Sequence, residues 1–269
     1  LLVFLVRRLR TRGDDPPPFF AFVPIGLIAG WLGSAAILWP IAGLTRLGET
    51  LIQQGVLISF VLAIGSHLGP RLLYGHRGFP ETTTPAAHRR LAGLFLLGLV
   101  LLGSFLVEAA VDPRAGLILR ALVVSGYLLI ALRVYRPPTS NLLHLHLLRL
   151  SFVMLALGLW VAALGTVSQQ LTALHLTFVG GLGLMTFTIA SRVVAGHAGF
   201  EELWDSHRAP LAIPLTLIAM ATPLRLAADA FPASYAQWLG ASAAAWVLGV
   251  TLWGIWFVPK MSPRHIAPD

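Results

Sequence analysis

Cysteine is missing from the sequence. Its absence excludes disulfide bonds, thiolate ligation of a haem iron, and cysteine-based zinc or iron–sulfur sites. The metal ligands that remain available are histidine, methionine, carboxylates and backbone carbonyls.

Charged residues are also scarce. They make up 11% of the chain, whereas soluble domains contain about 25%. Hydrophobic residues make up 57%, and the mean hydropathy is +0.79. These values are typical of a chain embedded in a lipid bilayer, and they predict an all-α fold, a polytopic integral membrane helix bundle.

Several catalytic signatures are absent as well. The sequence has no pair of adjacent histidines, no phosphate-binding loop, no Ser/His/Asp constellation and no His-Glu-x-x-His motif. Motifs therefore indicate no particular enzymatic activity. The net charge of +8 would suit nucleic acid, but the arginines cluster between apolar segments, which is how orientation is encoded in membrane proteins. We expect no nucleic-acid partner.

Long apolar segments are abundant. Each approaches the ~20 residues that a helix needs to cross the hydrocarbon layer. None shows the polar face of period 3.6 that is typical of a soluble bundle. We therefore predict about eight transmembrane helices, at residues 19–41, 48–68, 91–111, 116–134, 146–166, 170–192, 210–230 and 236–258.

The basic residues are distributed unevenly over the two ends of these predicted spans. If the first arginine cluster is cytoplasmic, 15 of the 19 basic residues fall on the cytoplasmic side. The four on the outer side are Arg46, Arg114, Arg120 and Arg225. This bias supports eight crossings, with the N- and C-termini of the chain both in the cytoplasm.

The two ends of the chain are predicted to lie outside the membrane. Residues 1–18 comprise the stub of a preceding helix and a basic, proline-rich cytoplasmic linker, since the prolines stop any helix. Residues 19–258 form the transmembrane helical domain, and residues 259–269 form a cytoplasmic tail. The chain begins within an apolar segment and without methionine, which favours a truncated chain or a short relative of longer proteins.

The most informative stretch covers residues 175–200. It is apolar for some sixteen residues but carries small and polar side chains that let a neighbouring helix or a flat ligand approach the backbone. One helical face is expected to collect Thr177, Gly181, Met185, Thr188 and Arg192. At a rise of ~1.5 Å per residue, His175 and His197 would lie roughly 33 Å apart and cannot bind one metal ion within this chain.

The ordered polar and glycine positions of this stretch resemble the signature of the NnrS family. The resemblance rests on His175, Gly180, Gly183, Met185, Thr186, Arg192, Val193, Gly196, His197 and Gly199. Weaker similarities lie at Gly65, Pro70, Leu224, Arg225, Pro263 and Arg264. The resemblance implies a multi-pass protein of the bacterial inner membrane that binds haem, of the b type, and copper, and that is connected with nitric oxide stress.

The chain also departs from the family pattern. The early Trp-His-x-His-Glu segment of the family is missing, and Phe200 and Arg149 stand where the family has an arginine and a histidine. If the missing histidines are metal ligands, one family site cannot form from these residues. By contrast, Gly65 and Pro70 agree with the family pattern, in which they resemble the end of a helix.

Polar residues near the predicted outer surface form the first candidate site. Glu108 with Arg120, and Arg225 with Asp229, are opposite charges at similar depths, and the second pair is four residues apart on one helix face. One interpretation is that these pairs only neutralise one another near the headgroups. The other, which follows from the resemblance, is that His175 ligates the haem iron while Arg120 and Arg225 hold the propionates.

Histidines near the predicted cytoplasmic surface form the second candidate set. His67 and His197 each follow a span, beside glycines, and are candidate metal ligands in addition to His175. His144 and His146 are two residues apart, ~200° around a helix, so a helix cannot direct both at one centre. The histidines in loops are interpreted as solvated: His76, His88, His207 and His265.

The sequence thus predicts an NnrS-like membrane protein that binds haem and copper. Its expected partners are the lipid bilayer and nitric oxide or another small ligand. Two other functions stay open. One is a haem-less structural subunit packed against other membrane subunits, which the missing histidine segment favours. The other is a carrier for a small anion that uses Arg120 and Arg225 as counter-charges.

Overall fold

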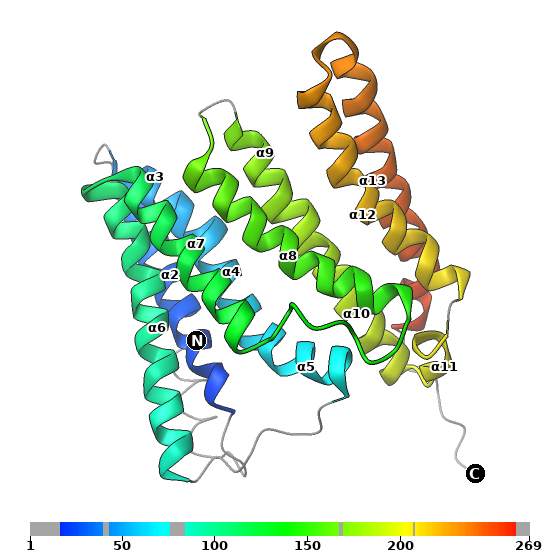
Figure 1. The fold of residues 1–269 in the computed structure, drawn as a ribbon, viewed down its shortest axis with the longest axis horizontal. Helices are drawn as coiled ribbons and strands as arrows, with labels where there is room; N and C mark the ends of the chain where they lie inside the picture. The colour runs from blue at the N-terminus through cyan, green and yellow to red at the C-terminus, as the bar shows by residue number, and fades with distance from the viewer. Residues whose placement is uncertain (1–16, 40–42, 76–83, 167–168, 207, 262–269) are drawn as a thin grey trace. The chain divides into compact units, whose positions relative to one another are not determined.

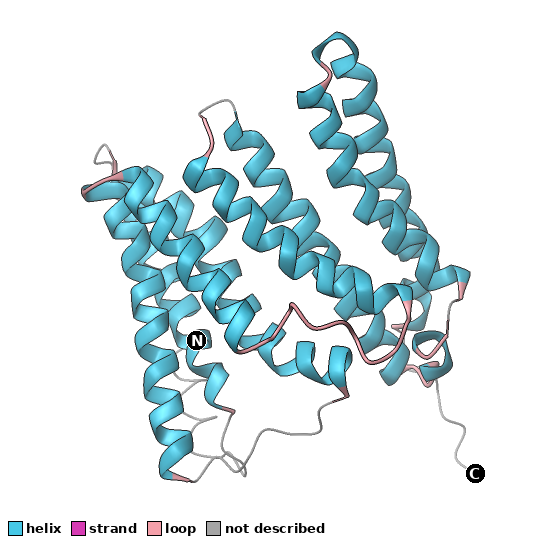
Figure 2. Ribbon diagram, viewed as in Figure 1, coloured by secondary structure: helices cyan, strands magenta, loops and turns pink. Residues whose placement is uncertain are grey.

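In the computed structural model, residues 17–39, 43–75, 84–166, 169–206 and 208–261 are described (Figure 1). Over these residues the chain forms helices joined by loops, without a strand (Figure 2). Eight helices in this part are long and apolar enough to cross a membrane: Pro18–Leu38, Leu44–Tyr74, Pro85–Ala110, Pro113–Ile130, Leu143–Leu164, Gln170–His197, Ala209–Ala230 and Pro232–Lys260. The predicted all-α fold of eight apolar helices is confirmed.

Several of these long helices are composites of shorter elements. In chain order the elements are η1 (Pro18–Ala21), α2 (Phe22–Leu38), α3 (Leu44–Thr50), η2 (Leu51–Val56), α4 (Leu57–Phe60), η3 (Val61–Gly65), α5 (Ser66–Tyr74), α6 (Pro85–Ala110), α7 (Pro113–Ile130), α8 (Leu143–Leu164), α9 (Gln170–His175), η5 (Leu176–Gly183), α10 (Leu184–His197), α11 (Glu201–Trp204), α12 (Ala209–Ala230), η6 (Pro232–Ser234), α13 (Tyr235–Phe257) and η7 (Val258–Lys260).

The chain divides into two compact units. The first comprises residues 1–71 and 76–106, and the second comprises residues 72–75 and 107–269. Most of the predicted N-terminal stub and linker, and most of the predicted tail, lie outside the described residues. The predicted boundaries of the transmembrane domain at 19 and 258 stay a prediction.

Glycines bring two helices of the first unit into backbone contact. A Cβ atom built at Gly33 of α2 would lie 2.9 Å from the carbonyl oxygen of Gly48 in α3. One built at Gly48 would lie 2.6 Å from the carbonyl oxygen of Gly33. Any larger residue at either position would force α2 and α3 apart.

The second unit is built around α8, η5, α10, α12 and α13. A Cβ atom at Gly181 of η5 would lie 3.0 Å from the backbone of Leu155 in α8, so these helices pack closely. The indole N–H of Trp253 in α13 donates to the hydroxyl of Ser191 in α10 at 2.8 Å. Most of the helical face predicted from the sequence is indeed buried here: Thr177, Gly181, Met185 and Thr188.

The second long helix runs further than predicted. We expected it to end at residue 68, but it continues through Pro70 to Tyr74. Proline lacks an N–H group and so removes one helical hydrogen bond, and packed membrane helices tolerate that loss.

Two of the long helices contain π-helical segments that the sequence did not predict. η2 and η3 interrupt the helix Leu44–Tyr74, and η5 interrupts the helix Gln170–His197. Short π segments within α-helices frequently mark functional sites. His175 directly precedes η5 and His67 follows η3 by two residues, so two of the three candidate histidines adjoin such turns.

Candidate functional site

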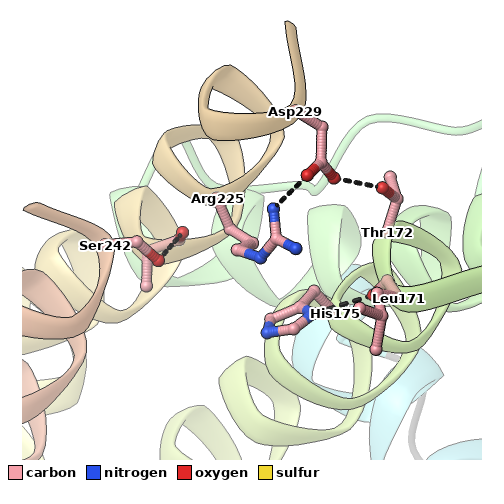
Figure 3. A network of polar contacts seen from close by, with 7 residues as sticks. Leu171, Thr172, His175, Arg225, Asp229 and Ser242 are labelled. Atoms are coloured by element: carbon pink, nitrogen blue, oxygen red, sulfur yellow. Dashed lines mark hydrogen bonds and ion pairs between the residues drawn. The ribbon is translucent and has the colours of Figure 1, made fainter. Parts of the chain in front are cut away.

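A polar network joins the end of α12 to the start of α9 in the second unit (Figure 3). Nη1 of Arg225 donates to Oδ1 of Asp229 at 2.6 Å, as expected for residues four apart on one helix. The hydroxyl of Thr172 in α9 donates to the other oxygen of the same carboxylate. Asp229 therefore holds an arginine of its own helix and a threonine of the neighbouring one.

The guanidinium of Arg225 is enclosed although its helix is near its end. Its side chain is 5% exposed. Its Cζ atom lies 5.7 Å from the ring centroid of Tyr235, the first residue of α13. A carboxylate on one side and an aromatic face on the other compensate for the lost hydration of the cation.

His175 lies beside this network. It is three residues after Thr172, so the two side chains share the helix face that is directed toward α12. Figure 3 shows the imidazole near Arg225, whose guanidinium is paired with Asp229. The structure thus brings together three residues that the sequence analysis treated as one group: His175, Arg225 and Asp229.

The hydrogen bond of His175 determines which ring nitrogen is available to a ligand. Nδ1 lies 2.7 Å from the carbonyl oxygen of Leu171. A carbonyl can only accept, so Nδ1 carries the proton and a neutral ring presents its lone pair on Nε2. Histidines that bind metals commonly donate their other ring nitrogen to a backbone carbonyl in this way.

Arg120 is held by a different carboxylate. It lies on α7 and pairs with Glu108 at the end of α6, and its side chain is 0% exposed while that of Glu108 is 18% exposed. A Cβ atom at Gly116 would lie 2.6 Å from both Cα and Cβ of Glu108, so α6 and α7 are in backbone contact beside the pair. The predicted Glu108–Arg120 pair exists, but the contacts described for Arg120 do not include the network around His175.

His67 belongs to the first unit, in an aromatic environment. Its ring centroid lies 5.4 Å from that of Phe19 and 5.9 Å from that of Phe20. Its Nδ1 atom is buried and has no hydrogen-bond partner among the described residues. A basic nitrogen with no donor or acceptor beside it is available for a proton or a ligand.

His197 lies at the opposite end of the helix that begins at Gln170. Its ring Nδ1 lies 2.9 Å from the carbonyl oxygen of Val193, and its side chain is exposed. His175 and His197 are 22 residues apart in one helix, which corresponds to roughly 33 Å along its axis.

The two histidines at the start of α8 face different neighbours. The buried ring of His144 packs on Trp204 of α11, with ring centroids 4.2 Å apart. Nε2 of His146 instead lies 3.1 Å from the side-chain oxygen of Asn141. Their different surroundings agree with the expectation that a helix cannot direct both at one centre.

Metal ligands are not clustered in the described part of the chain. No group of three or more histidine, aspartate or glutamate side chains that could hold a metal ion occurs there. A haem iron needs only one or two axial ligands from the protein, so His175 alone fits this requirement. Copper is ordinarily held by several side chains, and the described residues do not provide such a set.

Thr172 is the member of the network that the sequence analysis missed. The sequence holds many threonines in apolar segments. The neighbouring residues do not indicate whether a threonine donates to a carboxylate of another helix or to a backbone carbonyl of its own helix. The spacing of Thr172 and His175 was the available signal, because both lie on one face.

The fold and the charged network define a class, the polytopic α-helical membrane proteins with ion pairs inside their apolar helices. Comparison with known families is more specific: the family model described as NnrS protein matches residues 1–264. The chain therefore belongs to the NnrS family. No curated protein and no solved structure matched it in the same comparisons.

Proposed function

We propose that the protein binds haem b at His175 and acts in the response to, or metabolism of, nitric oxide. The observation that carries the proposal is the imidazole of His175, which has Nδ1 committed to the Leu171 carbonyl and stands beside the buried cation of Arg225. Membership of the NnrS family supports the same assignment.

Each residue of the network has a distinct part in this proposal. His175 presents Nε2 to the iron, and its hydrogen bond to Leu171 fixes the plane and tautomer of the ring. Arg225 provides positive charge for the propionates, with Asp229 keeping it in place until they arrive. Haem iron, when bound, supplies an open coordination position for a small ligand such as nitric oxide.

Arg120 was the second arginine that the resemblance implied for the propionates. Its guanidinium is 0% exposed and held by Glu108, so in this proposal it supports the packing of α6 on α7. Arg225, whose carboxylate partner is 35% exposed, is the arginine proposed to meet the propionates, and it would meet the anion in the alternative of a small-anion carrier.

For copper, the proposal uses His197 or His67, apart from the haem site. His197 lies at the other end of the helix that begins at Gln170, and His67 belongs to the first unit. The described residues do not gather three ligands, so any copper site here would have to be completed by ligands from elsewhere.

The proposed location is the bacterial inner membrane, with both termini in the cytoplasm. The eight apolar helices indicate contact with a lipid bilayer. The orientation is supported by the basic residues, because 15 of the 19 would lie on the cytoplasmic side. Other membrane subunits are candidate partners.

A pyridine haemochrome assay on the purified protein tests the haem assignment. We expect haem in the wild type, loss of most of it in His175→Ala, and retention in His197→Ala. The His197 variant is a matched control, because that histidine lies in the same helix and also has its Nδ1 beside a carbonyl. Copper content is measured on the same samples, and we expect it to fall in His197→Ala or His67→Ala.

Three outcomes would contradict the proposal. Undiminished haem in His175→Ala would remove His175 from the site. A preparation without haem or metal that co-purifies with stoichiometric partners would indicate a structural subunit. A preparation without haem or metal that takes up small anions in proteoliposomes would indicate a carrier.

A further inference from the structure

Residues 131–142 form the loop between α7 and α8 (Figure 1). Hydrogen bonds from side chains elsewhere in the second unit hold its backbone. The guanidinium of Arg149 in α8 donates to two of its carbonyls, from Nε to Val134 at 2.6 Å and from Nη2 to Tyr135 at 3.0 Å. The hydroxyl of Tyr74 donates to the carbonyl of Arg133 at 2.8 Å. The loop is therefore tied down at three successive carbonyls.

Its side chains alternate between inward and outward directions. Leu132 is 1% exposed and Val134 is 6% exposed, so both anchor the loop in the protein. Arg133, Tyr135 and Arg136 are exposed. The backbone N–H of Arg136 donates to the carbonyl of Arg133 at 2.9 Å. This hydrogen bond closes a turn, so the two arginines are close to each other along the loop.

The backbone of Arg133 is also in an unusual conformation. Its φ angle is +53°, in the left-handed region where a helix most often ends on glycine. Residues with a side chain are uncommon in this region, so the position restricts the backbone of the loop. The carbonyl of Arg133 accepts the hydroxyl of Tyr74, and its side chain is directed outward.

Within the described part of the chain, the outward arginines of this loop make no ion pair. Residues 131–149 themselves contain no aspartate or glutamate. Arg208, by contrast, is 3.4 Å from Glu202. The guanidinium of Arg136 lies 5.8 Å from the ring centroid of Tyr135, which orients it along the surface.

The depth of this loop follows from the helices on either side. α7 ends at Ile130 and α8 begins at Leu143, and both are candidate membrane spans. A bilayer crossed by both helices would have its headgroups at this loop, a position that suits exposed tyrosine and arginine side chains. Lipid phosphates are the anions concentrated at that depth.

We propose that Arg133 and Arg136, with Tyr135 between them, form a binding site for the headgroup phosphate of an anionic phospholipid. Arginine binds phosphate oxygens through two parallel N–H donors, and the turn presents two such groups. Tyr135 packs against the glycerol region. The site is independent of haem binding at His175, so the two proposals fail separately.

Native mass spectrometry of the full-length chain in detergent, titrated with phosphatidylglycerol, tests this site. The main variant is Arg133→Asn with Arg136→Gln, because asparagine tolerates the left-handed region while removing the charge. We expect the affinity for the first bound lipid to fall about fivefold for each arginine removed. The single variant Arg136→Gln is measured as well. The side chain of Arg136 makes no described hydrogen bond, so its loss should not affect folding, and the test stays valid if the double variant folds poorly.

Arg208→Gln is the matched control, because it removes an exposed arginine that already has a carboxylate partner. We expect it to bind phosphatidylglycerol as the wild type does. Equal loss in Arg208→Gln, equal affinity of the wild type for phosphatidylcholine, or unchanged binding in both loop variants would overturn the proposal. Displacement of the lipid by millimolar inorganic phosphate would reassign the site to a soluble anion.

Discussion

The two ion pairs of the second unit, Arg120 with Glu108 and Arg225 with Asp229, differ in what surrounds them. The first connects two helices, and its arginine is 0% exposed. The second lies on one helix, and its carboxylate is 35% exposed and shared with Thr172. Both neutralise an arginine within an apolar segment, and the second stands beside a histidine with an available ring nitrogen.

This difference separates a structural role from a binding role. The guanidinium of Arg120 is closed off from solvent between two touching helices, so its carboxylate cannot be exchanged for a ligand, and breaking the pair is costly. Arg225 is also buried, but its carboxylate is 35% exposed, so an incoming anion can take the place of that carboxylate beside the guanidinium. We infer that Glu108 and Arg120 hold α6 against α7, while Asp229 and Arg225 are the part of the protein that responds to a bound group.

The largest predicted effect tests the structural pair. Glu108→Ala removes the carboxylate beside a fully buried arginine, and we expect it to lower the stability of the protein by about 3–5 kcal/mol. Asp229→Ala also removes the partner of a buried arginine, but the lost carboxylate is 35% exposed, so water can replace it, and we expect a smaller loss of about 1–3 kcal/mol. Thermal unfolding in detergent, followed by tryptophan fluorescence, measures both.

Glu202→Gln is the control for that comparison, because Glu202 is an exposed carboxylate that pairs with Arg208. We expect no measurable change in its unfolding temperature. If Asp229→Ala destabilised the protein as strongly as Glu108→Ala, the division between a structural pair and a binding pair would be wrong.

A second, smaller effect tests the close approach of α6 and α7 beside the structural pair. Gly116→Ala places a Cβ atom 2.6 Å from Cα of Glu108, so the helices must separate. We expect a loss of about 1–3 kcal/mol in the same unfolding measurement. Gly126 lies on the same helix with nothing within 4 Å of a built Cβ, so Gly126→Ala should be neutral or slightly stabilising. Equal behaviour of the two alanines would mean that the contact is not made.

Much of this arrangement follows from the sequence because it depends on local chemistry. A run of some twenty apolar residues must form a helix in lipid, where its backbone groups find no other partners, so the eight helices were predictable. The Arg225–Asp229 pair was predictable from its spacing of four residues. The Glu108–Arg120 pair followed from two opposite charges at similar depths on neighbouring spans.

The features that could not be predicted depend on how helices pack. Thr172 contacts Asp229 only because α9 is rotated toward α12, and helix rotation is set by side chains distant in the sequence. The π segments beside His67 and His175 were likewise not predicted. The aromatic contacts of His67 come from Phe19 and Phe20, almost fifty residues earlier.

The smallest predicted effect examines the link between the binding pair and His175. Thr172→Val removes the hydroxyl that donates to Asp229 and preserves the shape of the side chain, so we expect a loss of stability of about 1 kcal/mol. Because Thr172 is one turn before His175, the same change loosens the register of α9 against α12 and should lower the haem retained per protein. Thr251→Val, at an exposed position of α13, is the matched control and should change neither quantity. The link would be contradicted if Thr172→Val kept its full haem content while Asp229→Ala lost haem. Asp229 would then affect the haem site through Arg225 alone, and the hydrogen bond between α9 and α12 would have only a structural role.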